Sequence, residues 1–220
     1  SDVILYILIM SIGALVSQVV IWIIVCSNIK FVKINFSDLI SHFKPNLILF
    51  IPVIAVSIYR TMDKIMLGYL ANMTEVGYYE NAEKIISILL SFITALGTVM
   101  LPRMAALFES QDKKQIQLMI NKSFVFISFI SSIVAFGVSS IANNFVILYY
   151  GNNYASSGII LQLLCITVPF ISYANIVRMQ ILIPQGKDKA YVISCFSGAI
   201  INLILNGMLI PKFHAVGAAI

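Results

Sequence analysis

The chain has 220 residues, of which 60% are hydrophobic and only 10% are charged, and its formal net charge is +5. Water-soluble domains carry about 25% charged residues, so this composition excludes an ordinary soluble protein. The mean hydropathy is +0.98, and the apolar residues occur in long blocks rather than at amphipathic spacing. We therefore predict an integral membrane protein of the all-α class, a polytopic bundle of transmembrane helices.

Each apolar block is close to the roughly 20 residues that a helix needs to cross a bilayer. The predicted transmembrane helices are Val3–Cys26, Leu47–Leu70, Ile85–Leu107, Phe124–Leu148, Ile159–Ile183 and Ala190–Ile210. A further helix is expected to begin at Ala215–Ile220 and to be cut off there. The chain begins without an initiator Met or the charged start of a signal peptide, so we expect an internal piece of a longer, transporter-sized protein.

Lysine and arginine are concentrated in alternate connections between these blocks. Three connections, Ser27–Asn46, Arg103–Lys122 and Pro184–Lys189, are basic, whereas Ala71–Asn81 and Tyr149–Ser157 contain no Lys or Arg. By the positive-inside rule the basic connections are cytoplasmic, and the other two are outside. The positive net charge is therefore a topology signal, and it does not indicate nucleic-acid binding.

The sequence contains no recognisable catalytic, metal or cofactor motif. Its three cysteines lie in separate apolar blocks without a C-x-x-C spacing, and His42 and His214 are far apart. Neither G-x-x-x-x-G-K-[ST] nor G-x-G-x-x-G occurs. We expect no metal, no cofactor and no enzymatic activity. Active transport would depend on an ion gradient, the substrate gradient or another chain.

Three charged residues, Arg60, Asp63 and Lys64, interrupt the second predicted helix. A charge at this depth costs roughly 2.5–3.5 kcal/mol on insertion scales, so such residues usually face a protein-lined or water-filled cavity. At about 100° per residue the three share one helix face, where Asp63 offsets only one of the two cations. We interpret them as a net positive substrate-binding site for an anionic group. The alternatives are snorkelling of Lys64 and a structural role for Arg60.

Two further features are candidates for moving parts. Glu80, Glu83 and Lys84 open the third predicted helix at the outer face, as an outer gate or as an ordinary solvated helix start. Pro169 lies near the centre of its predicted helix, where a proline frees a carbonyl group and permits a hinge. Helix packing alone is the other explanation of Pro169.

Four short runs in the order of the chain resemble one family. They are Asp63-Lys64-Ile65-Met66-Leu67-Gly68-Tyr69-Leu70, Glu75-Val76-Gly77-Tyr78-Tyr79, Asn81-Ala82-Glu83-Lys84-Ile85 and Leu101-Pro102-Arg103-Met104. These runs resemble the bacterial oligosaccharide repeat-unit flippases, the Wzx-type members of the multidrug/oligosaccharidyl-lipid/polysaccharide exporter superfamily. In that family the second run is an outer turn, and the four runs belong to the helix pair that opens the second half.

The resemblance implies an alternating-access transporter of about 12–14 spans in two pseudo-symmetric bundles. Residues 1–46 would hold the last helix of the first bundle and a cytoplasmic connection, and residues 47–220 most of the second bundle. The implied substrate is an undecaprenyl-diphosphate-linked oligosaccharide, moved from the inner to the outer leaflet of the bacterial cytoplasmic membrane. A polysaccharide polymerase and chain-length proteins are candidate partners beside the lipid bilayer. An H⁺- or Na⁺-coupled multidrug antiporter and a non-transporting scaffold for polysaccharide assembly remain the alternatives.

Overall fold

The computed structural model describes residues 2–26 and 61–220, together with positions 40, 43, 50, 54 and 57. The chain divides into two compact units, residues Ser1–Asn46 and Leu47–Ile220. All regular secondary structure in the described residues is helical, which confirms the predicted all-α class. Five helices are long and apolar enough to cross a membrane in this part of the chain.

The first unit contains one helix, α1 (Asp2–Cys26), in agreement with the first predicted span. Its 25 residues give a length of about 38 Å, which exceeds the roughly 30 Å of a bilayer core. Large apolar side chains are exposed all round it, from Ile4 to Val25. A helix that is hydrophobic on every face requires lipid or other helices around it.

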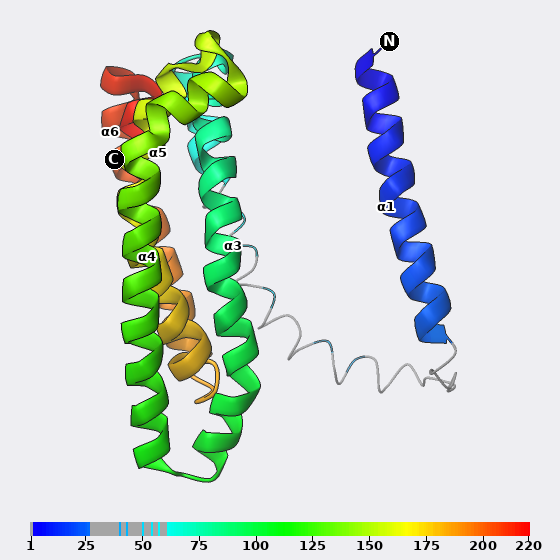
Figure 1. The fold of residues 1–220 in the computed structure, drawn as a ribbon, viewed down its shortest axis with the longest axis vertical. Helices are drawn as coiled ribbons and strands as arrows, with labels where there is room; N and C mark the ends of the chain where they lie inside the picture. The colour runs from blue at the N-terminus through cyan, green and yellow to red at the C-terminus, as the bar shows by residue number, and fades with distance from the viewer. Residues whose placement is uncertain are drawn as a thin grey trace. The chain divides into compact units, whose positions relative to one another are not determined.

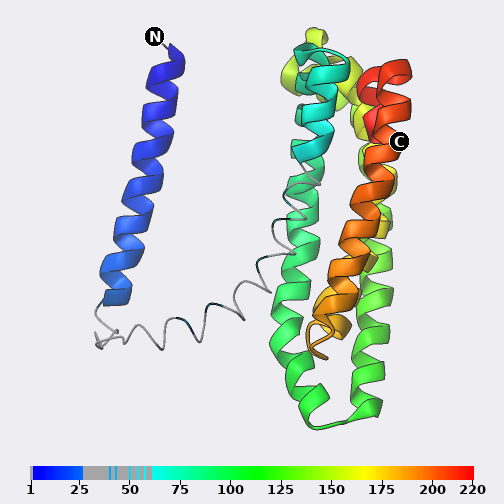
Figure 2. The same cartoon turned by 180° about the vertical axis from the view of Figure 1, so that it is seen from behind.

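The second unit is a bundle whose elements follow one another with short connections (Figures 1 and 2). They are a helical segment at residues 61–70, α3 (Met73–Glu109), α4 (Lys113–Tyr150), the 3-10 turn η1 (Asn152–Tyr154), α5 (Ser156–Ile176), the π-helix η2 (Val177–Leu182) and α6 (Asp188–Ala219). The four predicted spans from Ile85 onward are confirmed. The second predicted span, Leu47–Leu70, lies outside the described residues up to Arg60, apart from three isolated positions.

Helix α5 is the central element of this unit. Nine of its 21 residues are buried, against seven of 37 in α3 and six of 38 in α4. Its most extensive contacts are with α4, followed by those with α3. Small residues permit this approach: a Cβ at Gly158 would lie only 2.9 Å from the Asn143 backbone on α4. The large buried side chains Ile160, Leu161 and Val168 complete the core from α5.

Two of the predicted connections are wrong, because the helices run through them. The expected outer loop Ala71–Asn81 is helical from Met73, and the Asn72 side chain caps α3 by accepting from the Glu75 N–H at 3.0 Å. The resemblance implied an outer turn at Glu75–Tyr79, and this too is helix. Acidic residues lower the hydropathy here, but they suit the first turns of a helix, whose N-terminus is partially positive.

The expected basic loop Arg103–Lys122 is reduced to a turn at residues 110–112, where Gln111 has φ 55°. Asp112 caps α4 by accepting from the Gln115 N–H at 3.0 Å. Helices α3 and α4 therefore have 37 and 38 residues, about 56 Å each, and extend well beyond a bilayer core. Three basic residues, Lys113, Lys114 and Lys122, lie on the extension of α4 before the predicted span. Alternate connections still fall at opposite ends of the bundle (Figure 1).

Helix α6 does not end at Ile210, as the apolar block suggested. It continues to a break at His214, where φ is 53° and ψ is −131°, and helical residues resume up to Ala219. Residues 215–219 therefore form a separate helical turn after the break, where the sequence predicted that a new helix begins. After the break the chain doubles back, so that Gly217 lies against the Leu209 backbone. This close approach requires glycine.

Candidate polar site within the bundle

Asp63 is the buried polar centre of the second unit. It lies on the helical segment 61–70, and only 7% of its surface is exposed. The Asn206 amide of α6 donates to one carboxylate oxygen at 2.6 Å, and the Tyr79 hydroxyl of α3 donates to the other at 3.3 Å. The second Asn206 amide hydrogen reaches the Asn202 side-chain oxygen at 3.2 Å. Three helical segments thus converge on one carboxylate.

The neighbouring Lys64 has a different partner. Its ammonium lies 2.7 Å from the Glu83 carboxylate of α3, and the two side chains are 31% and 27% exposed. Asp63 therefore does not offset Lys64, and the positive charge expected from Lys64 is neutralised by a residue of the next helix. Arg60, the deepest of the three predicted site residues, lies outside the described residues.

The predicted outer-gate residues belong to two separate contacts. Glu80 and Lys84 form the expected pair, with their charged atoms 3.2 Å apart and both side chains well exposed. Glu83 instead faces Lys64. The Glu80–Lys84 pair has the geometry of a solvated pair on the α3 surface, whereas the Lys64–Glu83 pair joins the segment 61–70 to α3. Whether any of these residues forms a gate stays a prediction.

The polar centre lies near one end of the bundle rather than at its middle. Tyr79 is six residues into α3, or about 9 Å from the helix start. Close to the same end, the Glu75 carboxylate accepts from the Ala215 N–H at 3.1 Å, directly after the break in α6. Asp63 and Glu75 therefore both connect this end of α3 with α6. The sequence contained no sign of either contact, because Asp63 and Asn206 are 143 residues apart and Glu75 and Ala215 are 140 residues apart.

Pro169 lies within α5, which continues through it as a helix to Ile176. Its predicted role as a hinge is not tested by this geometry. One turn further on, Ser172 is buried and donates to the Val168 carbonyl at 2.6 Å. The irregular part of this span comes later, in the π-helix η2, which the sequence did not predict.

The π-helix contains a further buried polar group of this span. Gln180 is fully buried, and neither atom of its amide has a hydrogen-bond partner among the described residues. The guanidinium carbon of Arg178 lies 4.6 Å from the centroid of the Tyr191 ring, a cation–π arrangement. Such π-segments are frequent at functional sites, and the Arg178 Nε is likewise buried without a hydrogen-bond partner among the described residues.

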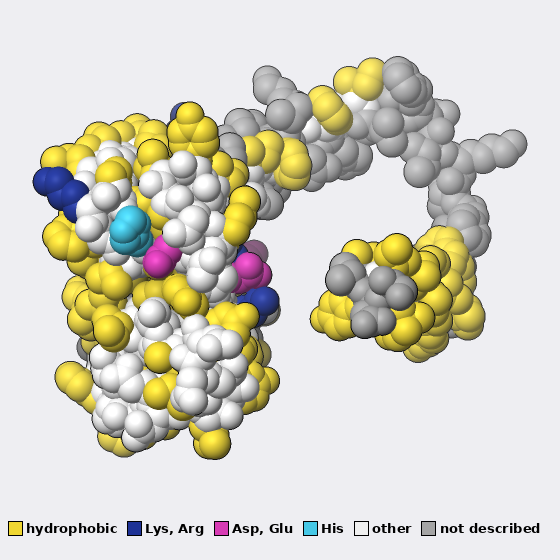
Figure 3. All heavy atoms as spheres, turned by 90° about the horizontal axis from the view of Figure 1, so that it is seen from above, with side chains coloured by type: hydrophobic (Ala, Val, Ile, Leu, Met, Phe, Trp, Pro, Cys, Tyr) yellow, Lys and Arg dark blue, Asp and Glu magenta, His cyan; other side chains and the backbone are white. Residues whose placement is uncertain are grey.

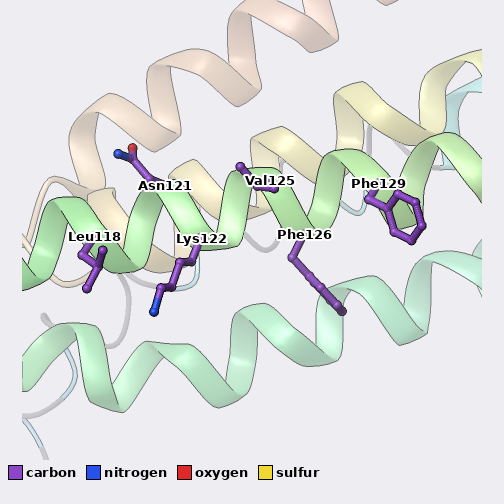
Figure 4. Close-up of a pocket in the computed structure, with 6 residues that line it drawn as sticks. All are labelled: Leu118, Asn121, Lys122, Val125, Phe126 and Phe129. Atoms are coloured by element: carbon purple, nitrogen blue, oxygen red, sulfur yellow. The ribbon is translucent and has the colours of Figure 1, made fainter.

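Surface hollows occur at several places on the second unit. One of about 460 Å³ lies near the start of α4, and all six of its lining residues belong to that helix (Figure 4). They are Leu118, Asn121, Lys122, Val125, Phe126 and Phe129. This face is predominantly apolar, as expected for contact with lipid or with another part of the protein. Another hollow lies at the opposite end of the bundle, whose surface is mainly uncharged (Figure 3).

No group of three or more potential metal ligands occurs among the described His, Cys, Asp and Glu residues. The fold and the polar site together define a multi-pass helical membrane protein with a hydrogen-bonded carboxylate inside its bundle. A family described as polysaccharide biosynthesis protein matches residues 6–159. Because this match covers more than half of the chain, the chain belongs to that family. The resemblance found in the sequence is confirmed at this level.

Curated relatives come from both archaea and bacteria. An uncharacterized membrane protein of Methanocaldococcus jannaschii is 29% identical over 72% of this chain and 31% of its own length. A putative O-antigen transporter of Escherichia coli is 26% identical, over 78% of this chain and 41% of its own. A probable low-salt glycan biosynthesis flippase of Haloferax volcanii is 26% identical, over 74% of this chain and 34% of its own length. The chain thus spans less than half the length of each relative. No solved structure matches it.

Proposed function

We propose that the whole protein is a flippase that moves a lipid-linked oligosaccharide from the inner to the outer leaflet of a cytoplasmic membrane. In a bacterium the carrier would be undecaprenyl diphosphate, and the product a precursor of O-antigen, capsule or exopolysaccharide. Membership of the polysaccharide biosynthesis family carries this proposal. Two relatives, named as a putative O-antigen transporter and a probable glycan biosynthesis flippase, support it. Transport would proceed by alternating access between this bundle and another, with no catalytic chemistry.

The polar site suggests how a charged head group could be accommodated. Arg60 precedes Asp63 by three residues, and Asp63 is already held by neutral donors from α3 and α6. Lys64 is neutralised by Glu83. Of the two cations in this run, Arg60 is therefore our candidate for contact with a diphosphate, because its planar fork donates two parallel hydrogen bonds to phosphate oxygens. Asp63 and Lys64 would then position the segment that carries it.

Arg60→Ala tests this assignment in the full-length protein, expressed in a strain that lacks the native gene. Surface glycan should be lost while the amount of protein in the membrane stays near normal, since only one cation is removed. Arg60→Lys should retain part of the export, because the charge survives without the fork. Arg103→Ala, which removes an exposed arginine of α3, is the matched control and should export normally. Normal surface glycan in Arg60→Ala would refute contact between Arg60 and the substrate.

A second function deserves a direct comparison, because one observation favours it. Among the described residues Asp63 accepts hydrogen bonds from neutral donors only, as expected for a carboxylate that binds a coupling ion in a multidrug antiporter. The proposed flippase predicts loss of surface glycan on gene deletion with unchanged drug tolerance. An antiporter predicts unchanged surface glycan and altered drug tolerance on gene deletion. A scaffold for a polymerase and chain-length proteins would tolerate neutral replacement of Arg60.

A further inference from the structure

A hollow of about 390 Å³ lies at the end of the bundle where α3 begins, within the range of about 300–1,000 Å³ that is typical of small-molecule sites. Two elements far apart in the sequence line it. The lining residues are Met73, Thr74, Gly77 and Tyr78 of α3, with Asn153 and Tyr154 of η1. The two connections that meet here, at residues 71–72 and 151–155, contain no Lys or Arg, so the positive-inside rule predicts that this end faces outward.

The hollow has an aromatic wall. The Tyr78 and Tyr154 rings meet edge to face, with their centroids 6.0 Å apart and an interplanar angle of 89°. Tyr154 is supported from behind by Tyr150, whose ring centroid is 5.8 Å away. Aromatic rings fixed in this way offer an apolar surface at little cost in conformational entropy. The C–H face of a pyranose ring is complementary to such a surface.

The polar groups of the hollow are available for a ligand. Among the described residues no hydrogen bond engages the Thr74 hydroxyl, the Asn153 amide or the phenol groups of Tyr78 and Tyr154. Together they provide both donors and acceptors, as the hydroxyl groups of a sugar require. No charged side chain lines the hollow, which disfavours a phosphate or an acidic sugar. Hydroxyl and amide groups at the rim also disfavour an acyl chain.

We propose that this hollow, which we term the tyrosine pocket, binds a neutral sugar residue of the transported glycan at the outward end of the bundle. The sugar ring would stack on Tyr78 or Tyr154 and exchange hydrogen bonds with Asn153 and Thr74. This proposal rests on the proposed function, which it deepens by assigning a place for the saccharide. An ordinary interfacial belt of aromatic residues is the competing explanation.

Binding to the purified full-length protein in nanodiscs tests the tyrosine pocket. The probe is the neutral repeat-unit oligosaccharide released by mild acid from the surface glycan of the source organism and labelled with a fluorophore at its reducing end. Tyr154→Ala and Asn153→Ala should each weaken binding by roughly 3- to 10-fold, the loss expected for one stacking or hydrogen-bonding partner. Tyr154→Phe keeps the ring and should lose less than Tyr154→Ala.

Tyr149→Ala is the matched control, because Tyr149 is 69% exposed in the same aromatic cluster and does not line the pocket. It should bind the oligosaccharide like the wild-type protein. Any of three results would overturn the proposal: binding weakened equally in Tyr149→Ala, binding unchanged in Tyr154→Ala, or no binding by the wild-type protein. A parallel measurement of surface glycan distinguishes failure of the pocket proposal from failure of the proposed function. Normal export with unchanged binding by Tyr154→Ala leaves the flippase standing without the pocket, whereas specific binding without any export leaves the pocket and refutes the flippase.

Discussion

Replacing Asn206 by leucine should destabilise the bundle through the carboxylate of Asp63. Asn206 is 3% exposed, and its amide donates to Asp63 at 2.6 Å and to Asn202 at 3.2 Å. A hydrogen bond to a charged group contributes about 1.5–3 kcal/mol, and a neutral one about 0.5–1.5 kcal/mol. Leucine removes both, and the Tyr79 hydroxyl at 3.3 Å and the Asn202 side chain remain as hydrogen-bond partners of Asp63. We therefore expect a loss of about 2–4 kcal/mol in the free energy of unfolding.

The double variant Asp63→Leu/Asn206→Leu distinguishes this cause from a simple packing defect. Replacing both partners by apolar side chains of similar shape leaves no unpaired group between them, so the double variant should lose about 1–3 kcal/mol less than the sum of the two single variants. Asn202→Leu removes the acceptor of the second Asn206 amide hydrogen and a side-chain hydrogen bond to Asp63, so it should also destabilise the bundle.

The assay is the unfolding of the purified full-length variants in detergent, with surface glycan measured in parallel. Wild-type stability of Asn206→Leu would refute the role assigned to the Asp63 carboxylate. So would a loss of stability in the double variant that equals the sum of the losses in the single variants. Export gives separate information about Asp63. If Asp63 only holds the helices together, the double variant recovers export along with stability; if it takes part in transport, stability recovers and export does not.

In a cysteine-free full-length protein, a single cysteine at Asn152 should react with an impermeant thiol reagent added from outside, and one at Lys113 should not. Lys113 begins α4 and Asn152 follows the opposite end of that helix, so the two positions lie on opposite sides of the membrane. The reverse pattern would invert the predicted orientation. Gly158→Ala should cost about 1–3 kcal/mol of stability, since the new Cβ would lie 2.9 Å from the Asn143 backbone and α4 and α5 would have to separate. Gly137→Ala meets open space in the middle of α4 and should be neutral or slightly stabilising, because alanine favours the helix; an equal loss in both variants would contradict this reasoning.

The amino-acid sequence alone determined the class of this protein and most of its transmembrane helices. Long apolar blocks such as Phe124–Leu148 can be stable only inside a membrane, and in a membrane the backbone must be helical because no water satisfies its polar groups. The family was also visible in the sequence, since the runs around Asp63 and Pro102 are local. Helix ends were predicted poorly. Hydropathy reports which residues enter the lipid, whereas α3 and α4 continue beyond it.

The tertiary structure decided which polar residues meet. Asp63 and Lys64 are adjacent on one helix, yet one bonds to Asn206 and Tyr79 and the other to Glu83. Helical periodicity specifies which residues of one segment share a face, but it contains no information about which face of another helix lies opposite. The tyrosine pocket depends in the same way on the packing of η1 against the start of α3. These contacts join distant parts of the chain, and only the folded bundle brings them together.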